Sequence, residues 1–134
     1  MAQRRGRNSG QKYPRSARVG ETLREIIAED LVRLDDERLE FVTVTSVDVD
    51  PELNRAIVFF DSLNGEDGDA DIVEALDGHR VRLQSSIARQ IKAKKTPILS
   101  FQPDIVIRSA ERIETILRAD RERDSSYRSP EATD

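Results

Sequence analysis

Hydrophobic residues in the first part of the chain follow a helical spacing. From residue 19 to residue 34 they recur at steps of three and four, which predicts an amphipathic helix built on Val19, Leu23, Ile26, Ile27, Leu31 and Leu34. Ser16 is a suitable N-cap, so the helix should begin near Ala17. The opposite face of this helix mixes acidic and basic side chains and is expected to be solvated.

Two stretches rich in β-branched and aromatic residues follow, at residues 41–49 and 55–63. The turn-forming residues between them predict that the two strands pair as an antiparallel hairpin. In the first strand Val42 and Val44 share one parity, whereas Val47 and Val49 share the other. Because side chains alternate between the two faces of a strand, this switch predicts a β-bulge or a bend at Thr45–Ser46.

The pattern returns to helical spacing after residue 70 and is interrupted once. One helix is predicted from Ile72, Val73 and Leu76, and a second, which reaches about Lys95, from Leu83, Ile87 and Ile91. Gly78 lies between them and predicts a kink, since glycine costs a helix interior about 1 kcal/mol relative to alanine. Pro97 ends the second helix, and a third strand and a last helix follow, with Asp104 as the expected N-cap of that helix.

The predicted order is helix, strand, strand, helix, kink, helix, strand and a short C-terminal helix. This order indicates an α+β domain in which a three-stranded sheet is covered by helices on one face. We assign the domain to residues 17–118, between a disordered basic arm at 1–16 and a disordered charged tail at 119–134. The phenylalanines lie in apolar strand patterns and are expected in the core: Phe41, Phe59, Phe60 and Phe101.

The net charge of −4 conceals a separation of charge along the chain. Residues 1–18 contain six cationic side chains and no acidic one, whereas residues 61–77 contain seven acidic side chains and no cationic one. The 134 residues provide one domain, and the absence of Cys excludes a disulfide framework and a Cys-ligated zinc site. No stretch is apolar enough for a membrane span or a signal peptide, so we expect a cytoplasmic protein.

The second helix of the kinked pair gives the strongest functional signal. Residues 79–95 contain six Lys or Arg side chains and no acidic one, and the apolar stripe on the same helix should turn those cations outward. An uncompensated row of cations favours binding to RNA phosphates. The predicted RNA-binding residues come from this stretch and from the N-terminal helix: His79, Arg80, Arg82, Arg89, Lys92, Lys94, Lys95, Arg15, Arg18 and Arg24.

Two other functions are compatible with these residues. The cations could dock an acidic protein partner, or Asp67, Asp69 and Asp71 could hold a metal ion in a nuclease. The only histidine, His79, has no second His or Cys with which to share a metal ion. We therefore predict no catalytic residue, no metal, no cofactor and no small-molecule substrate.

Three segments resemble the ribosome-binding factor A family over roughly residues 15–118: Arg18-Val19-Gly20, Pro51-Glu52-Leu53-Asn54-Arg55-Ala56, and Thr96-Pro97-Ile98-Leu99-Ser100-Phe101 followed by Asp104. The resemblance implies a type II KH-like domain in which an interhelical kink replaces the G-x-x-G loop. It also implies a monomeric bacterial factor that binds the small ribosomal subunit and its precursor RNA. Members of the family assist late maturation, including 5′-end processing of that RNA, as assembly factors rather than nucleases. The chain departs from the family pattern at residues 35–40, which are more acidic, and at the kink.

Overall fold

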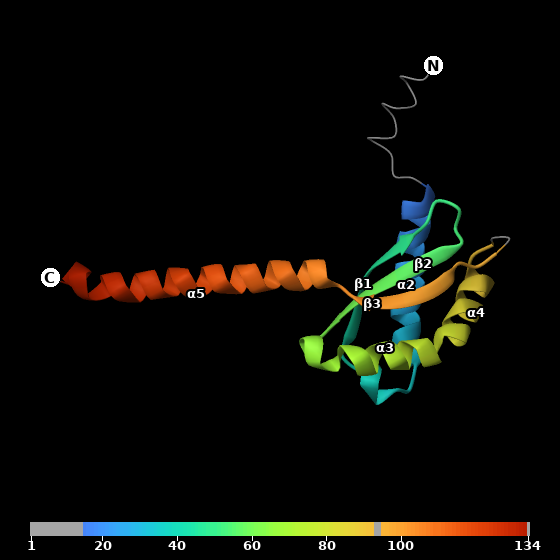
Figure 1. The fold of residues 1–134 in the computed structure, drawn as a ribbon, viewed down its shortest axis with the longest axis horizontal. Helices are drawn as coiled ribbons and strands as arrows, with labels where there is room; N and C mark the ends of the chain where they lie inside the picture. Colours follow the sequence, from blue (N-terminus) through green and yellow to red (C-terminus); the bar gives the residue numbers. More distant parts are fainter. Residues whose placement is uncertain (1–14, 93–94, 134) are drawn as a thin grey trace, which may run out of the picture. The chain divides into compact units, whose positions relative to one another are not determined.

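The computed structural model describes residues 15–92 and 95–133, without the side chains of residues 125–133. It contains, in chain order, α2 (Arg15–Arg33), η1 (Glu37–Leu39), β1 (Val42–Val49), β2 (Arg55–Ser62), η2 (Gly65–Gly68), α3 (Asp69–Gly78), α4 (Arg80–Gln90), β3 (Ile98–Pro103) and α5 (Ile105–Thr133) (Figure 1). The chain divides into two units, Met1–Pro103 and Asp104–Asp134. The predicted α+β class and the order of the elements are confirmed.

The three strands form one sheet in the order β1-β2-β3. β1 and β2 pair antiparallel as a hairpin, and β2 and β3 pair parallel. The register of β1 shifts between Val44 and Ser46, so the predicted β-bulge is confirmed. Because of this shift Val44 and Val47 lie opposite Phe60 and Val58, and both face the helices although their positions differ in parity.

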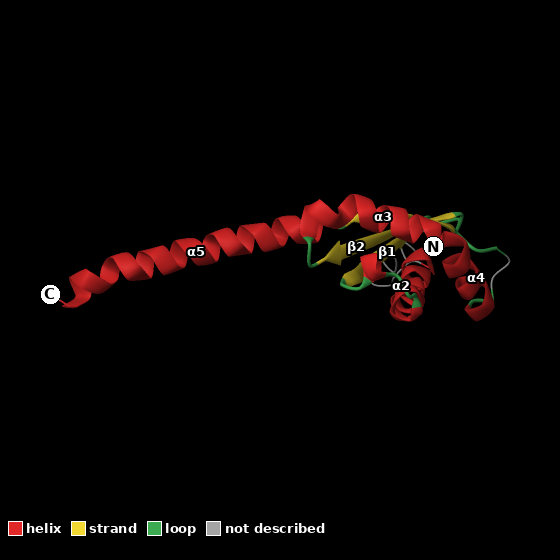
Figure 2. Ribbon diagram, turned by 90° about the horizontal axis from the view of Figure 1, so that it is seen from below, coloured by secondary structure: helices red, strands yellow, loops and turns green. Residues whose placement is uncertain are grey.

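The helices of the first unit bury one face of this sheet. In β2 the buried residues Ala56, Val58 and Phe60 alternate with partly exposed ones, which is the pattern of a sheet covered on one side. Figure 2 shows α2 and α4 on the same side of the strands. The predicted apolar stripes supply the rest of the core, which includes Leu23, Ile26, Ile27 and Leu31 of α2, Ile72, Ala75 and Leu76 of α3, and Leu83 and Ile87 of α4.

Helix α2 crosses β1 at very close range at Gly20. A Cβ atom on this residue would lie 2.5 Å from the backbone oxygen of Val47. Only a residue without a side chain permits this approach, so the glycine in the Arg18-Val19-Gly20 segment has a packing role. Ser16 lies within α2 rather than at its N-cap, because Arg15 is already helical. Residues 1–14, most of the predicted basic arm, lie outside the described residues.

A side chain of α4 closes part of the free edge of β3. The backbone amide of Leu99 donates a hydrogen bond to Oε1 of Gln84 at 3.1 Å, whereas the neighbouring amide of Ile98 donates to the carbonyl oxygen of Asn54, just before β2. This contact fixes the position of α4 along β3.

The second unit differs from the prediction in the length of its helix. The predicted N-cap is confirmed, because Asp104 Oδ1 accepts a hydrogen bond from the amide of Ile107 at 3.0 Å. However, α5 continues to Thr133, whereas a short helix and an unstructured tail from residue 119 were expected. The helix-forming Arg and Glu residues and ion pairs one turn apart, such as Arg118 with Glu114, account for the extra length.

Two of the four phenylalanines predicted in the core, Phe60 and Phe101, belong to it, whereas Phe59 and Phe41 do not. Phe60 and Phe101 are buried and Phe59 is partly buried, but Phe41 is 60% exposed. Phe41 lies just before the first residue of β1, and it lines an open cleft rather than the core.

Candidate nucleic-acid interface

The predicted kink is a single residue, His79, between α3 and α4. Its backbone has φ −99° and ψ 6°, which interrupts the helix, and its amide still bonds to the carbonyl oxygens of Ala75 and Leu76. Gly78 ends α3 as predicted, but no atom lies within 4 Å of the place where its Cβ would be. The bend is therefore at His79, and its geometry does not require glycine at position 78.

The side chain of His79 is held by the segment that follows α2. Its Nε2 lies 3.0 Å from Oδ2 of Asp36, and the same carboxylate accepts bonds from Nη2 of Arg38 at 2.9 Å and Nε of Arg38 at 3.1 Å. Arg38 also reaches Glu74 on α3 at 3.4 Å. The kink is thus attached to η1 by a polar network, and His79, which we predicted to contact RNA, is engaged with a carboxylate of the protein.

This network lowers the pKa of Asp36 far below its usual range. The side-chain hydrogen bond from Arg38 is the main cause, and the hydrogen bond from His79 is the second. The same pairing raises the pKa of Arg38. Asp36 is therefore ionised at neutral pH, and it presents a negative charge to the kink.

Acid should weaken this network, and Asp36→Asn tests that expectation. Because the pKa of Asp36 is lower in the folded than in the unfolded chain, its contribution to stability is complete above about pH 4 and is lost as the pH falls towards the folded pKa. We expect Asp36→Asn to lower the melting temperature at pH 7, and the difference from wild type to shrink between pH 5 and pH 3. The neighbouring Asp35→Asn, whose carboxylate has no ion pair within the described residues, should give no such pH-dependent difference. A constant difference for Asp36→Asn across this range would contradict the assignment.

The basic helix is shorter than predicted. α4 ends at Gln90, and Ile91 adopts an extended conformation with φ −109° and ψ 123°. Ile91 still packs against the core, so the apolar stripe continues although the helix does not. Lys92 and Lys95 consequently lie on the connection to β3 rather than on α4, and Lys94 lies outside the described residues.

Two of the predicted arginines lie together with a third from α2. Arg82 and Arg89 are two turns apart on one face of α4, and with Arg33 they line a small cleft of about 120 Å³ that also includes Asp30 and Ser86. We call this the arginine cleft (Arg33, Arg82, Arg89). Arg33 approaches Asp30 at 3.6 Å, whereas Arg82 and Arg89 are exposed and have no ion pair among the described residues. Sequence reasoning missed Arg33 because it placed that residue on a solvated face.

Arg80 lies on a different side of α4. It approaches Asp77 at 3.4 Å and lines a cleft of about 700 Å³ with Arg55, Ile57 and Ile98. The predicted single row of cations is therefore wrong in detail, because the helical turn separates Arg80 from Arg82 and Arg89.

The remaining predicted cations differ in whether they already have an ion-pair or hydrogen-bond partner. Arg15 and Arg18 are exposed in the first turn of α2, and Arg18 is about 22 Å along the helix from Arg33. Arg24 is bonded to Glu21 at 2.6 Å, and Nζ of Lys95 is hydrogen-bonded to Asn54. Lys92 is exposed without an ion pair in the part of the chain that the structure describes. The cations available for a ligand are therefore Arg82, Arg89, Lys92, Arg15 and Arg18.

The acidic segment does not assemble a metal site. Among residues 15–92 and 95–133, no group of three or more His, Cys, Asp or Glu side chains is arranged to hold a metal ion. Asp67, Asp69 and Asp71, the set considered for a nuclease, are thus not gathered around one point. No helix in the described ranges is long and apolar enough to cross a membrane.

Comparison with known proteins identifies the family. The family model described as "Ribosome-binding factor A" matches residues 15–117, which cover both the kinked helices and the sheet. This chain belongs to the ribosome-binding factor A family. A family member from Acidothermus cellulolyticus is 36% identical over 113 residues, covering 81% of this chain and 75% of the relative. Ribosome-binding factor A from Rubrobacter xylanophilus is 36% identical over 105 residues, covering 78% of this chain and 85% of the relative.

Solved structures agree with this membership. The crystal structure of ribosome-binding factor A from Thermus thermophilus matches with a TM-score of 0.60 and 27% identity, covering 66% of this chain and 93% of that one. A homology model of the same Thermus protein, fitted into a cryo-electron-microscopy map of its complex with the 30S subunit, matches with a TM-score of 0.55, at 28% identity and with 65% and 92% coverage. The fold is the KH-like fold of ribosome-binding factor A.

Proposed function

We propose that this chain binds the immature small ribosomal subunit and contacts its precursor RNA through the arginine cleft. It acts in the cytoplasm as a monomer and assists late maturation of the particle, including 5′-end processing of the RNA, without covalent chemistry of its own. The observation that carries the proposal is the meeting of Arg82 and Arg89 of α4 with Arg33 of α2 around one small cleft. A related protein, ribosome-binding factor A of Thermus thermophilus, has been fitted into a 30S complex, which supports the choice of partner.

The geometry suits the RNA backbone better than the base edges. Guanidinium groups form paired hydrogen bonds with phosphate oxygens, and two exposed arginines on one helical face can reach neighbouring phosphates. Lys92, exposed on the connection after α4, extends the positive surface. Phe60 and Phe101 are buried and Phe59 is only partly exposed, so we expect recognition to depend on phosphate, sugar and RNA shape rather than on bases stacked against the strands.

Sedimentation of the full-length chain with small subunits tests this function. We expect the tagged wild-type chain to sediment with free small subunits rather than with complete ribosomes. The variant Arg82→Glu/Arg89→Glu/Lys92→Glu should remain at the top of the gradient, because three cations that have no ion pair within the described residues become anions that repel phosphate. These side chains are exposed, so the variant should still fold, which circular dichroism would verify.

A matched control carries the same change of net charge on α5, in Arg118→Glu/Arg121→Glu/Arg123→Glu, and should still sediment with small subunits. Equal loss of binding in both variants would contradict the arginine cleft as the contact. Cleavage of precursor RNA by the purified chain with Mg²⁺ alone would instead favour a nuclease. If the chain instead retained an acidic protein and did not bind small subunits, a protein-interaction module would be favoured.

A further inference from the structure

Three large apolar side chains are exposed at the end of the sheet where β1 begins and β2 ends. Phe41 is 60% exposed, Leu63 is 80% exposed and Val32, near the end of α2, is 85% exposed. Phe41 precedes Val42, and Leu63 follows Ser62, which is the partner of Val42 across the strands. An exposed aromatic residue beside further apolar side chains is typical of a binding surface.

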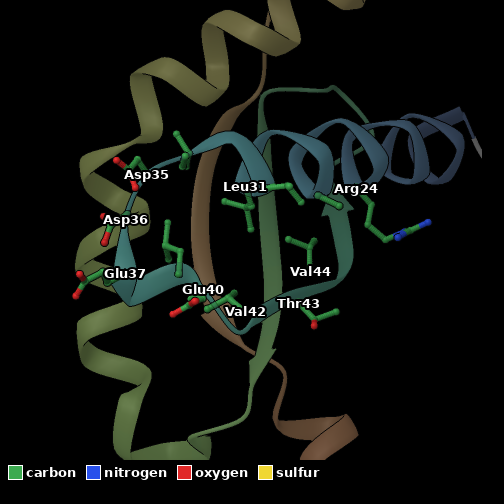
Figure 3. A pocket seen from close by; sticks show the side chains of 13 residues that line it. Arg24, Leu31, Asp35, Asp36, Glu37, Glu40, Val42, Thr43 and Val44 are labelled. Atoms are coloured by element: carbon green, nitrogen blue, oxygen red, sulfur yellow. The ribbon is translucent and has the colours of Figure 1, made fainter.

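Two clefts lie on either side of the η1 segment at this end of the domain. One, of about 600 Å³, lies between α2 and β1, and Figure 3 shows Leu31, Val42 and Val44 inside it, with the acidic side chains of residues 35–40 around one end. The other, of about 300 Å³, is lined by Phe41, Val42 and Ile72 together with Glu37 and Asp71. Glu37 and Val42 line both clefts, so the two form one continuous surface.

The charge of this surface is negative because its cations are already engaged. Arg24, the only cation lining the larger cleft among the described residues, is paired with Glu21. Arg38, the only cation lining the smaller one in those residues, is bonded to Asp36 and Glu74 and is also close enough to interact with Asp71. Asp35, Glu37 and Glu40 have no ion pair within the described part of the chain. The two clefts and the exposed apolar side chains around them are together called the acidic docking surface (Val32, Glu37, Glu40, Phe41, Leu63, Asp71).

We propose that the acidic docking surface binds a basic protein segment of the small ribosomal subunit. The segment carries Lys or Arg side chains for Glu37, Glu40 and Asp71, and an apolar side chain for Phe41. The inference rests on the proposed function, since proteins packed against ribosomal RNA are rich in Lys and Arg. RNA itself does not fit, because uncompensated carboxylates repel phosphate.

Charge complementarity and the position of the arginine cleft favour this occupant over a second copy of the chain. A second copy would have to present its own Arg82 and Arg89, which would remove them from RNA. Such a pair of chains would also join two different surfaces, the arginine cleft of one copy and the acidic docking surface of the other. Contacts between unlike surfaces lead to open-ended assembly unless the copies close into a ring. The chain would thus hold RNA with one surface and protein with another on the same particle.

Photocrosslinking from each surface tests this arrangement. The full-length chain carries p-benzoylphenylalanine in place of Phe41 in one sample and in place of Val81, 78% exposed in the first turn of α4, in the other. Each is bound to purified immature small subunits and irradiated. We expect the Phe41 probe to crosslink a Lys/Arg-rich protein segment, identified by mass spectrometry, and the Val81 probe to crosslink ribosomal RNA.

Charge reversal supplies the second arm of the experiment. Glu37→Lys/Glu40→Lys should reduce the protein crosslink from position 41 at least about tenfold and leave the RNA crosslink from position 81 unchanged. Co-sedimentation with an RNA crosslink or no crosslink from position 41 would overturn this inference alone, as would a crosslink to a second copy or to residues 1–14 of the same chain. Failure of the wild-type chain to co-sediment would overturn the proposed function and this inference with it.

Discussion

Gly20→Ala is expected to destabilise the domain by about 1–2 kcal/mol. The new methyl group would lie 2.5 Å from the carbonyl oxygen of Val47, which belongs to a strand fixed by its pairing with β2. Relieving such a clash by moving a helix or a strand costs about 1–3 kcal/mol, and the better helix propensity of alanine returns at most about 1 kcal/mol. Urea unfolding of the wild-type chain and the variant measures the difference.

Gly78→Ala is the matched control for that experiment. It makes the same substitution in a helix, at a residue whose Cβ would meet nothing within 4 Å and whose φ is not positive. We expect an unchanged free energy of unfolding or a gain of up to about 1 kcal/mol. Equal destabilisation by the two substitutions would show that the contact between α2 and β1 is not what requires glycine.

The second large effect concerns RNA binding and its dependence on salt. In Arg82→Gln/Arg89→Gln, affinity for small-subunit RNA should fall at least about 100-fold at low salt, since each charged hydrogen bond is worth about 1.5 kcal/mol or more. The slope of log K against log salt should become shallower by about 1.4 to 1.8, because each lost phosphate contact removes about 0.7 to 0.9. Fluorescence anisotropy over a salt series gives both quantities.

Arg80→Gln provides the comparison on the same helix. Arg80 already approaches Asp77 and lies apart from the arginine cleft, so its replacement should change the slope by less than half as much as the double substitution. A slope unaffected by the double substitution, or one that changes equally with Arg80→Gln, would remove the arginine cleft from the RNA contact.

Features that depend on local periodicity could be predicted from the sequence. The apolar stripes of α2, α3 and α4 repeat at helical steps, so the spacing of apolar residues in each helix predicts which face is buried. The bulge in β1 was visible because Val44 and Val47 differ in parity, which a regular strand cannot reconcile with one buried face. The kink was visible as a break in the stripe after Leu76.

Features that depend on contacts between distant residues could not be predicted in this way. The bond between His79 and Asp36 joins residues 43 positions apart, and the arginine cleft joins Arg33 to Arg82 across the α2–α4 contact. Hydrophobic character alone placed Phe41 in the core, but its position just outside β1 leaves it exposed. The end of α4 was also missed, because Ile91 keeps its helical spacing and its contact with the core while the backbone has already become extended.

The hydrogen bond between Gln84 and Leu99 links the position of Arg82 and Arg89 on α4 to the free edge of β3. Gln84 lies on α4 between Arg82 and Arg89, so any displacement that carries these arginines outward also uncovers an unpaired amide on the outermost strand. An uncovered edge strand recruits strands from other molecules. The helix that carries Arg82 and Arg89 therefore also covers part of the free edge of the sheet, and we expect displacement of this helix to promote aggregation.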